Sequence, residues 1–152
     1  MSDKKCRWGI LGSAGIAQKN WQSIHHAENA ELVAVASRDV AKSQDFINRC
    51  SAQVPHIDKP MALGSYEELL SRDDIDAIYL PLPTGLRPEW ALKVAKAGKH
   101  LLCEKPCGTS LKQVQDIVAA CDRAGVQFMD GVMFMHSERL KRVRAVIDDG
   151  AT

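Results

Sequence analysis

Short apolar runs alternate with segments of helical periodicity along almost the whole chain. The apolar runs predict buried strands, because their side chains are continuously hydrophobic rather than alternating. These strands are predicted over 6–11, 31–36, 61–63, 76–82, 99–103 and 126–129. The segments between them predict helices over 16–26, 40–50, 66–71, 88–97, 111–124 and 138–148, with a proline-containing loop over 51–60.

Local signals mark the ends of several of these helices. Ser65 and Ser110 each begin the pattern S-x-x-E/Q, which is typical of a helix N-terminus closed by a capping box. Pro88 suits the first turn of a helix. Gly98 and Gly125 stand where a helix typically ends.

Strands separated by helical crossovers predict a parallel arrangement, since parallel neighbours need a long connection. We therefore expect an α/β fold with a doubly wound, mostly parallel sheet of the Rossmann type. The chain has 152 residues, of which 45% are hydrophobic and 26% charged, as in one ordinary globular domain. We assign residues 1–150 to this one domain.

Composition and charge exclude several classes of function. The net charge of +1 does not indicate a protein that binds nucleic acid. No apolar run is long enough to span a membrane. The polar N-terminus carries no signal segment. The five cysteines include no C-x-x-C pair, so we expect reduced thiols, no metal site and a cytoplasmic protein.

A glycine turn joins the first predicted strand to the first predicted helix. Gly12, Ala14 and Ala17 occupy the three places of the G-x-G-x-x-G/A fingerprint, so the second glycine is replaced by alanine. A strand, such a turn and a helix N-terminus together present backbone N–H groups to a phosphate. A tight connection without a ligand explains the glycines equally well.

The end of the second predicted strand carries Ser37 and Arg38, with Lys42 one helical turn later. A dinucleotide fold that takes NAD usually has a carboxylate here, whereas a hydroxyl and a guanidinium suit a 2′-phosphate. We therefore expect NADP, with NAD less favoured, although Asp39 partly opposes the phosphate. The alternative is an ordinary solvated turn.

A proline-rich loop follows the strand predicted over 76–82. It contains Pro81, Leu82, Pro83 and Thr84, and it lies at a carboxyl end of the sheet, where ligands bind in open α/β folds. Thr84 either caps the next helix or contacts the cofactor.

The next strand is followed by Glu104 and Lys105. A lysine beside a nicotinamide suits proton exchange with a hydroxyl or carbonyl group, and Glu104 would hold the lysine or contact the ribose. The alternative is a surface Glu–Lys pair in a turn. His136 is a weaker candidate, and the remaining histidines are interpreted as structural.

Four segments resemble the N-terminal half of the Gfo/Idh/MocA oxidoreductases. They are GILGSAGIA (9–17), ASRD (36–39), PLPTGLRPEWA (81–91) and AGKHLLCEKP (97–106), and the last is the most specific. The segment over 128–136 is similar to the family's linker between its two halves.

The resemblance implies NAD(P)-dependent oxidation or reduction of a sugar, polyol or diol, with Lys105 as the catalytic residue. It implies that Ser37 and Arg38 contact the 2′-phosphate and that Glu104 and residues 81–84 border the nicotinamide ribose. The pyrophosphate would lie on Gly12, Ser13, Ala14, Gly15 and Ile16.

Two departures from the family pattern stand out. Arg87 occupies a position where the family often has histidine. The family also continues into a second α+β domain that supplies the substrate pocket and most of the subunit interface. We expect that domain to be missing, since the chain ends where it would begin.

Three interpretations follow. The leading one is the cofactor-binding half of an NADP-dependent oxidoreductase, which alone binds cofactor without efficient turnover because substrate positioning is lacking. The second is a non-catalytic NADP-binding sensor or regulatory module, and the third a non-functional fragment. We expect a small-molecule substrate in the whole enzyme and no nucleic-acid or membrane partner, with a homo-oligomer left open.

Overall fold

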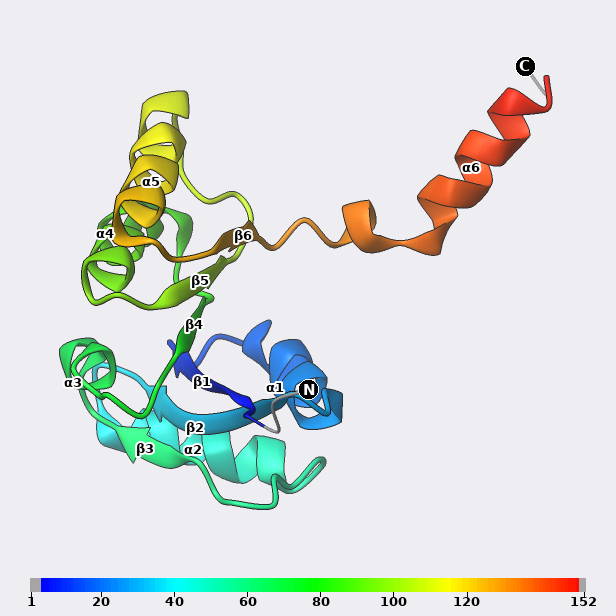
Figure 1. The fold of residues 1–152 in the computed structure, drawn as a ribbon. Helices are drawn as coiled ribbons and strands as arrows, with labels where there is room; N and C mark the ends of the chain where they lie inside the picture. Colours follow the sequence, from blue (N-terminus) through cyan, green and yellow to red (C-terminus); the bar gives the residue numbers. More distant parts are fainter. Residues whose placement is uncertain (1–3, 151–152) are drawn as a thin grey trace.

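The computed structural model describes residues 4–150 and contains one six-stranded sheet. Its strands are β1 (Cys6–Leu11), β2 (Ala30–Ala36), β3 (Met61–Leu63), β4 (Ala77–Leu80), β5 (His100–Cys103) and β6 (Phe128–Asp130). The helices are α1 (Ala17–His26), α2 (Val40–Ser51), α3 (Tyr66–Leu70), α4 (Arg87–Lys96), α5 (Leu111–Ala124) and α6 (Glu138–Asp148). Two 3-10 helices, η1 (Thr84–Leu86) and η2 (Met133–His136), complete the described elements (Figure 1).

All strand pairs are parallel, and their order is β3-β2-β1-β4-β5-β6. The chain thus moves outward from β1 in one direction and then from β4 in the other. Right-handed crossovers in opposite directions place the connecting helices on opposite faces of the sheet. The expected doubly wound α/β fold is confirmed.

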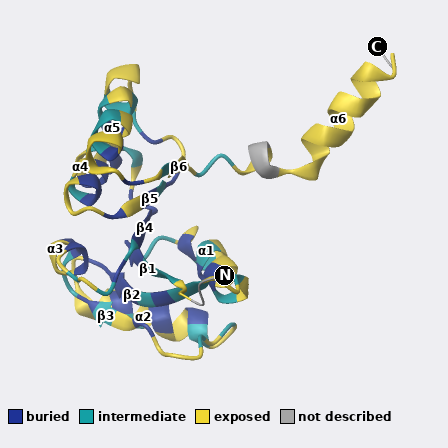
Figure 2. Cartoon of the chain, in the orientation of Figure 1, coloured by how far each residue is buried: buried dark blue, intermediate teal, exposed yellow. Residues whose placement is uncertain are grey.

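Each face of the sheet has its own hydrophobic core. Trp21 of α1 and Phe46 of α2 pack with Ile10 and Val35 on one face. On the other face, Trp90 of α4 and Ile117 of α5 belong to a larger cluster that includes Leu82 of the loop after β4. β4, in the middle of the sheet, is buried along its whole length, whereas the edge strands β3 and β6 include exposed residues (Figure 2).

The predicted ends of two strands are wrong by two residues. β4 ends at Leu80 rather than at residue 82, because Pro81 has no N–H to offer a neighbouring strand. β6 begins at Phe128, since the N–H of Val126 still bonds to the carbonyl of Cys121 at the end of α5 (3.0 Å).

The predicted caps are largely confirmed. Ser65 accepts a hydrogen bond from the N–H of Glu68, and Ser110 accepts one from the N–H of Gln113. The side chain of Gln113 turns to the N–H of Thr109 rather than to that of Ser110, so the second box is shifted by one residue. Gly125 closes α5 in the left-handed region, at a φ of 66°.

Polar contacts hold the amino ends of the strands together. The guanidinium of Arg7 binds both carboxylate oxygens of Asp76 (2.9 and 2.7 Å), which joins the starts of β1 and β4. Lys99 is buried and donates to the carbonyls of Arg72 and Ile75 (2.7 and 2.9 Å). These contacts fix the edge of the sheet that faces away from the predicted ligand site.

Helix α6 extends away from the layered body of the protein (Figure 1). Its residues are exposed along its whole length, including Leu140 and Val146 (Figure 2). Over residues 4–150, no helix is both long and apolar enough to cross a membrane.

The Arg7–Asp76 contact predicts a pH dependence of stability. Hydrogen bonding from Arg7 holds the pKa of Asp76 well below its usual range, so the contact contributes stability above about pH 4 and loses it as the carboxylate is protonated at lower pH. We expect Asp76→Asn to lower stability at pH 7 and to flatten its dependence on pH between about pH 5 and pH 2. Urea unfolding across this range measures both effects.

Asp122→Asn, in an exposed side chain of α5, is the matched control. It should leave the pH dependence close to that of the wild type. An Asp76→Asn profile parallel to the wild-type profile contradicts the prediction.

Candidate functional site

The carboxyl ends of the strands form one continuous edge. The residue after each of three strands still bonds to its neighbour: Gly12 N–H to Ala36 (2.8 Å), Glu104 N–H to Leu80 (3.2 Å) and Gly131 N–H to Cys103 (2.8 Å). The predicted glycine turn, the proline-rich loop and the Glu-Lys-Pro segment therefore leave the sheet side by side. In open α/β sheets this edge, at the point where the strand order reverses, is where ligands bind.

Only glycine fits at position 12. Its φ of 115° is rarely adopted by other residues, and a Cβ there would lie 2.8 Å from Cδ2 of Leu82. The turn thus packs directly against the loop that follows β4. This contact lies at the boundary between β1 and β4, where the two halves of the sheet meet.

The backbone beyond Gly12 offers unsatisfied donors. Among the described residues, no acceptor is found for the N–H groups of the four residues over 13–16, and Ile16, the N-cap of α1, has no side-chain cap. Unsatisfied N–H groups at a helix N-terminus suit a phosphate. The N–H groups of Ser13, Ala14, Gly15 and Ile16 are therefore available to an anionic ligand.

The three polar residues predicted to bind a 2′-phosphate lie around the end of β2. Ser37 is buried, whereas Arg38 and Lys42 are exposed. Lys42 and Ser13 line the same shallow hollow. Asp39, which was expected to partly oppose a phosphate, caps α2 by accepting from the N–H of Ala41 (2.9 Å).

Glu104 is held by two hydrogen bonds beneath the surface. The hydroxyl of Tyr79 donates to its Oε1 (2.7 Å), and the backbone N–H of Lys105 donates to its Oε2 (3.3 Å). Burial and this bond raise the pKa of Tyr79, so the phenol remains a donor. A Cβ on Gly131 would come within 3.1 Å of the carboxylate, which is therefore enclosed from that side as well.

Lys105 contrasts with its neighbour. Its side chain is exposed, and over residues 4–150 its ammonium forms no ion pair. Glu104 bonds to the backbone N–H of Lys105, whereas the sequence suggested that it would hold the side chain of this lysine. The peptide bond between Lys105 and Pro106 is cis.

The predicted capping role of Thr84 is wrong. Helix α4 has Leu86 as its N-cap and no side-chain cap, and the Thr84 hydroxyl instead accepts from Nη1 of Arg87 (3.2 Å). Arg87 also donates to the carbonyls of Leu82 (2.6 Å) and Pro106 (2.7 Å). The sequence singled out Arg87 only as a departure from the family pattern, and its contacts join two loops of the site.

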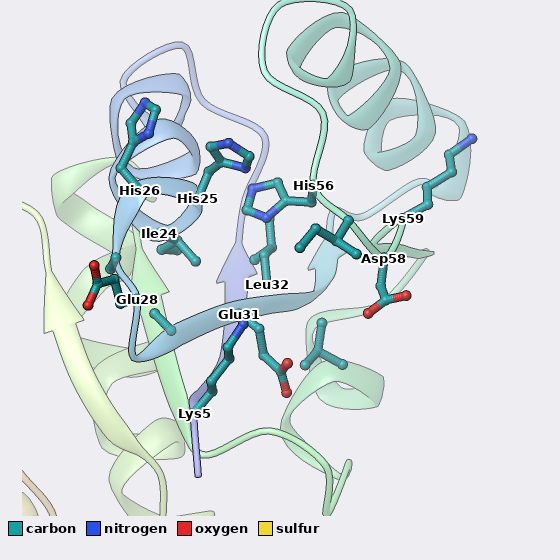
Figure 3. Close-up of a pocket in the computed structure, with 14 residues that line it drawn as sticks. Lys5, Ile24, His25, His26, Glu28, Glu31, Leu32, His56, Asp58 and Lys59 are labelled. Carbon is teal, nitrogen blue, oxygen red and sulfur yellow. The ribbon is translucent and has the colours of Figure 1, made fainter. Parts of the chain in front are cut away.

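A separate hollow lies at the opposite edge of the sheet. His25 of α1 and His56 of the loop before β3 point toward each other there, above Leu32 of β2 (Figure 3). His56 also packs edge-on against Trp21, and burial lowers its pKa. This supports the interpretation of these histidines as structural.

The side chain of His136 lies outside the described residues. Across the part of the chain that the structure describes, no group of three or more histidine, cysteine or acidic residues is placed to hold a metal ion.

Comparison with known proteins identifies the family. The family described as "Oxidoreductase family, NAD-binding Rossmann fold" (GFO_IDH_MocA) matches residues 6–132. The chain belongs to the Gfo/Idh/MocA oxidoreductases. The match includes the glycine turn, both site loops and all of β1 to β6.

The relatives include a sugar dehydrogenase and oxidoreductases whose structures contain a nicotinamide cofactor. "D-xylose 1-dehydrogenase (NADP(+)) 2" of Haloferax volcanii is 38% identical over 140 residues, which are 92% of this chain and 41% of that protein. The structure of the 3-ketoreductase KijD10 from Actinomadura kijaniata with NADP has a TM-score of 0.86 and 32% identity, over 97% of this chain and 45% of that one.

The WlbA dehydrogenase from Bordetella pertussis, solved with NADH and UDP-GlcNAcA, has a TM-score of 0.79 and 28% identity, over 97% of this chain and 43% of that one. Structures similar to this chain thus include both NADP and NADH complexes. The chain spans less than half the length of these relatives.

The bond between Tyr79 and Glu104 predicts a coupled effect on stability. We expect Tyr79→Phe to destabilise the chain by about 1–3 kcal/mol, because it leaves a buried carboxylate oxygen without its donor. In a Glu104→Leu background the same change should cost at least about 1 kcal/mol less. Urea unfolding of the two single variants and the double variant gives this coupling.

The second tyrosine of the chain supplies a control. Tyr66 packs against Trp90 and not against Glu104, so Tyr66→Phe should add to Glu104→Leu without coupling. If the effects of Tyr79→Phe and Glu104→Leu were additive, the hydrogen bond between the two side chains would contribute nothing to stability.

Proposed function

We propose that this chain is the cofactor-binding half of an NADP-dependent oxidoreductase that interconverts a hydroxyl and a carbonyl group on a sugar, polyol or diol. The observation that carries the proposal is the shared edge where the free N–H groups over 13–16, Arg38 and Lys105 all lie. Family membership and the sugar-related relatives support the reaction class.

The residues present fit a dinucleotide. The N–H groups of Ser13, Ala14, Gly15 and Ile16 would hold the pyrophosphate, and the absence of a Cβ at Gly12 leaves the turn close to the sheet. The loop of Pro81, Leu82, Pro83 and Thr84 and the carboxylate of Glu104 would border the nicotinamide ribose. When bound, the nicotinamide supplies a hydride donor or acceptor.

Selection of NADP over NAD would come from the residues after β2. Arg38 and Lys42 are exposed cations, and Asp39 is engaged at the N-terminus of α2. A guanidinium binds phosphate through paired, charge-assisted hydrogen bonds. The buried Ser37 would place this turn against the adenosine ribose.

Lys105 would handle the proton of the reaction. Its ammonium would donate to a substrate carbonyl oxygen during reduction, and its neutral amine would accept the hydroxyl proton during oxidation. The backbone bond to the fixed carboxylate of Glu104 would orient the residue while its side chain stays free to meet the substrate.

Turnover would require more than these residues. We propose that residues 1–150 act as one nucleotide-binding domain and that substrate positioning needs further residues of the kind present in the longer relatives. Orientation of the reacting carbon accounts for much of the rate in such reactions. The isolated chain is therefore proposed to bind cofactor without efficient turnover.

Calorimetry with NADPH and NADH tests the cofactor proposal. We expect the isolated chain to bind NADPH at least about tenfold more tightly than NADH, since charge-assisted bonds to the 2′-phosphate favour the former. Arg38→Glu should remove this preference. Arg123→Glu, at an exposed position on α5, should keep it, and equal affinities in the wild type would contradict the proposed role of Arg38.

Substitution of Lys105 separates catalysis from sensing. We expect Lys105→Ala to bind NADPH about as tightly as the wild type and to lower turnover of sugars or diols by about 10²–10⁴-fold in the full-length enzyme. Lys112→Ala, on the exposed face of α5, is the control for loss of a cation. Unchanged turnover in Lys105→Ala would contradict the catalytic role of this lysine, whereas NADPH binding without any turnover by the unsubstituted full-length protein would favour a sensor.

A further inference from the structure

Few backbone hydrogen bonds join the loop after β4 to the loop after β5 at the carboxyl edge of the sheet. The last backbone bond between them runs from the N–H of Glu104 to the carbonyl of Leu80. Beyond it, no backbone hydrogen bond links residues 81–86 to residues 105–109 in the described part of the chain. Their relative position therefore depends on side chains.

Arg87 is the side chain that connects them. Its Nε donates to the carbonyl of Leu82 (2.6 Å), and its Nη1 donates to Thr84 Oγ1 (3.2 Å) and to the carbonyl of Pro106 (2.7 Å). The first two acceptors lie in the loop after β4, and the third immediately follows Lys105. One planar group thus holds both loops in a fixed relation.

The burial of Arg87 shows that this connection is part of the packed interior. The residue is only 8% exposed, and none of the ion pairs within residues 4–150 includes it. Burying a guanidinium is costly unless its donors are satisfied, and here neutral oxygens accept from Nε and Nη1. A solvated surface arginine would not be held in this way.

We propose that Arg87 is a positioning residue that fixes the loop over 81–84 against Lys105 and Pro106 before cofactor binds. The inference rests on the proposed function, because it assigns these loops to the nicotinamide side of the site. A preformed site avoids the cost of ordering its loops on binding. Loss of Arg87 would then weaken binding of the nicotinamide half and leave the adenosine half unaffected.

Two ligands distinguish binding of the nicotinamide half of the cofactor from binding of its adenosine half. The first is NADPH, followed by calorimetry and by its nicotinamide fluorescence, and the second is 2′,5′-ADP, which carries the adenosine and its phosphates alone. We expect Arg87→Gln to weaken NADPH binding by about tenfold or more and to change 2′,5′-ADP binding by less than about twofold. Equal weakening for both probes would show a general structural role and overturn the proposal.

Arg87→Lys tests whether geometry or charge matters. Lysine keeps the charge but lacks the planar fork, so we expect it to behave like Arg87→Gln toward NADPH. Binding of NADPH at the wild-type level by this variant would show that charge alone suffices and would overturn the proposal.

Hydrogen exchange in the unsubstituted chain gives a test that does not depend on the folding of any variant. We expect two amides that are already hydrogen-bonded to be protected without cofactor and to gain little on adding NADPH: Leu86, bonded to the carbonyl of Pro83 (2.9 Å), and Thr109, bonded to Oε1 of Gln113 (2.8 Å). Protection of these two amides only with NADPH would show that the loops are not preformed. If Arg87→Gln binds 2′,5′-ADP and NADPH as tightly as the unsubstituted chain does, only the positioning role of Arg87 is refuted. If the unsubstituted chain binds neither ligand, the proposed function itself is refuted.

Discussion

The parallel pairing of β1 with both β2 and β4 is the constraint on which the rest of the structure depends. Because every strand runs the same way, every loop that follows a strand emerges at one edge. The chain then leaves β1 and β4 toward opposite faces, so the loops diverge there and cannot cover the edge between them. Gly12 leaves the edge between β1 and β4 uncovered and lets the turn pack closely against the next loop, because a Cβ at this position would clash with Leu82.

The site also depends on two buried charged groups that do not pair with each other. Glu104 is satisfied by a phenol and a backbone N–H, and Arg87 by two carbonyls and a hydroxyl. Each group fixes a loop through neutral partners, beside the edge where a ligand would lie.

The helices and strands, and the sheet edge at which their loops emerge, could be predicted from the sequence because hydrophobic runs, caps and glycines are local signals. The sequence was insufficient for Tyr79, which lies in an apolar strand and is indistinguishable there from a core residue. The contact between Arg87 and Pro106 joins residues 19 positions apart, and no local pattern indicates which carbonyl a long side chain will reach. The capping alternative for Thr84 is wrong for the same reason, since the partner of Thr84 lies inside the helix that it would have capped.

The two ends of the proposed cofactor site are built by different physical means. At the adenosine end, Arg38 and Lys42 are exposed long cations, whose attraction for a phosphate is screened by salt and whose side chains must be ordered on binding. At the nicotinamide end, buried hydrogen bonds around Glu104 and Arg87 are made in advance and are little affected by salt. The exposed end can therefore discriminate between cofactors without disturbing the geometry at Lys105, where a small displacement would matter most for proton transfer.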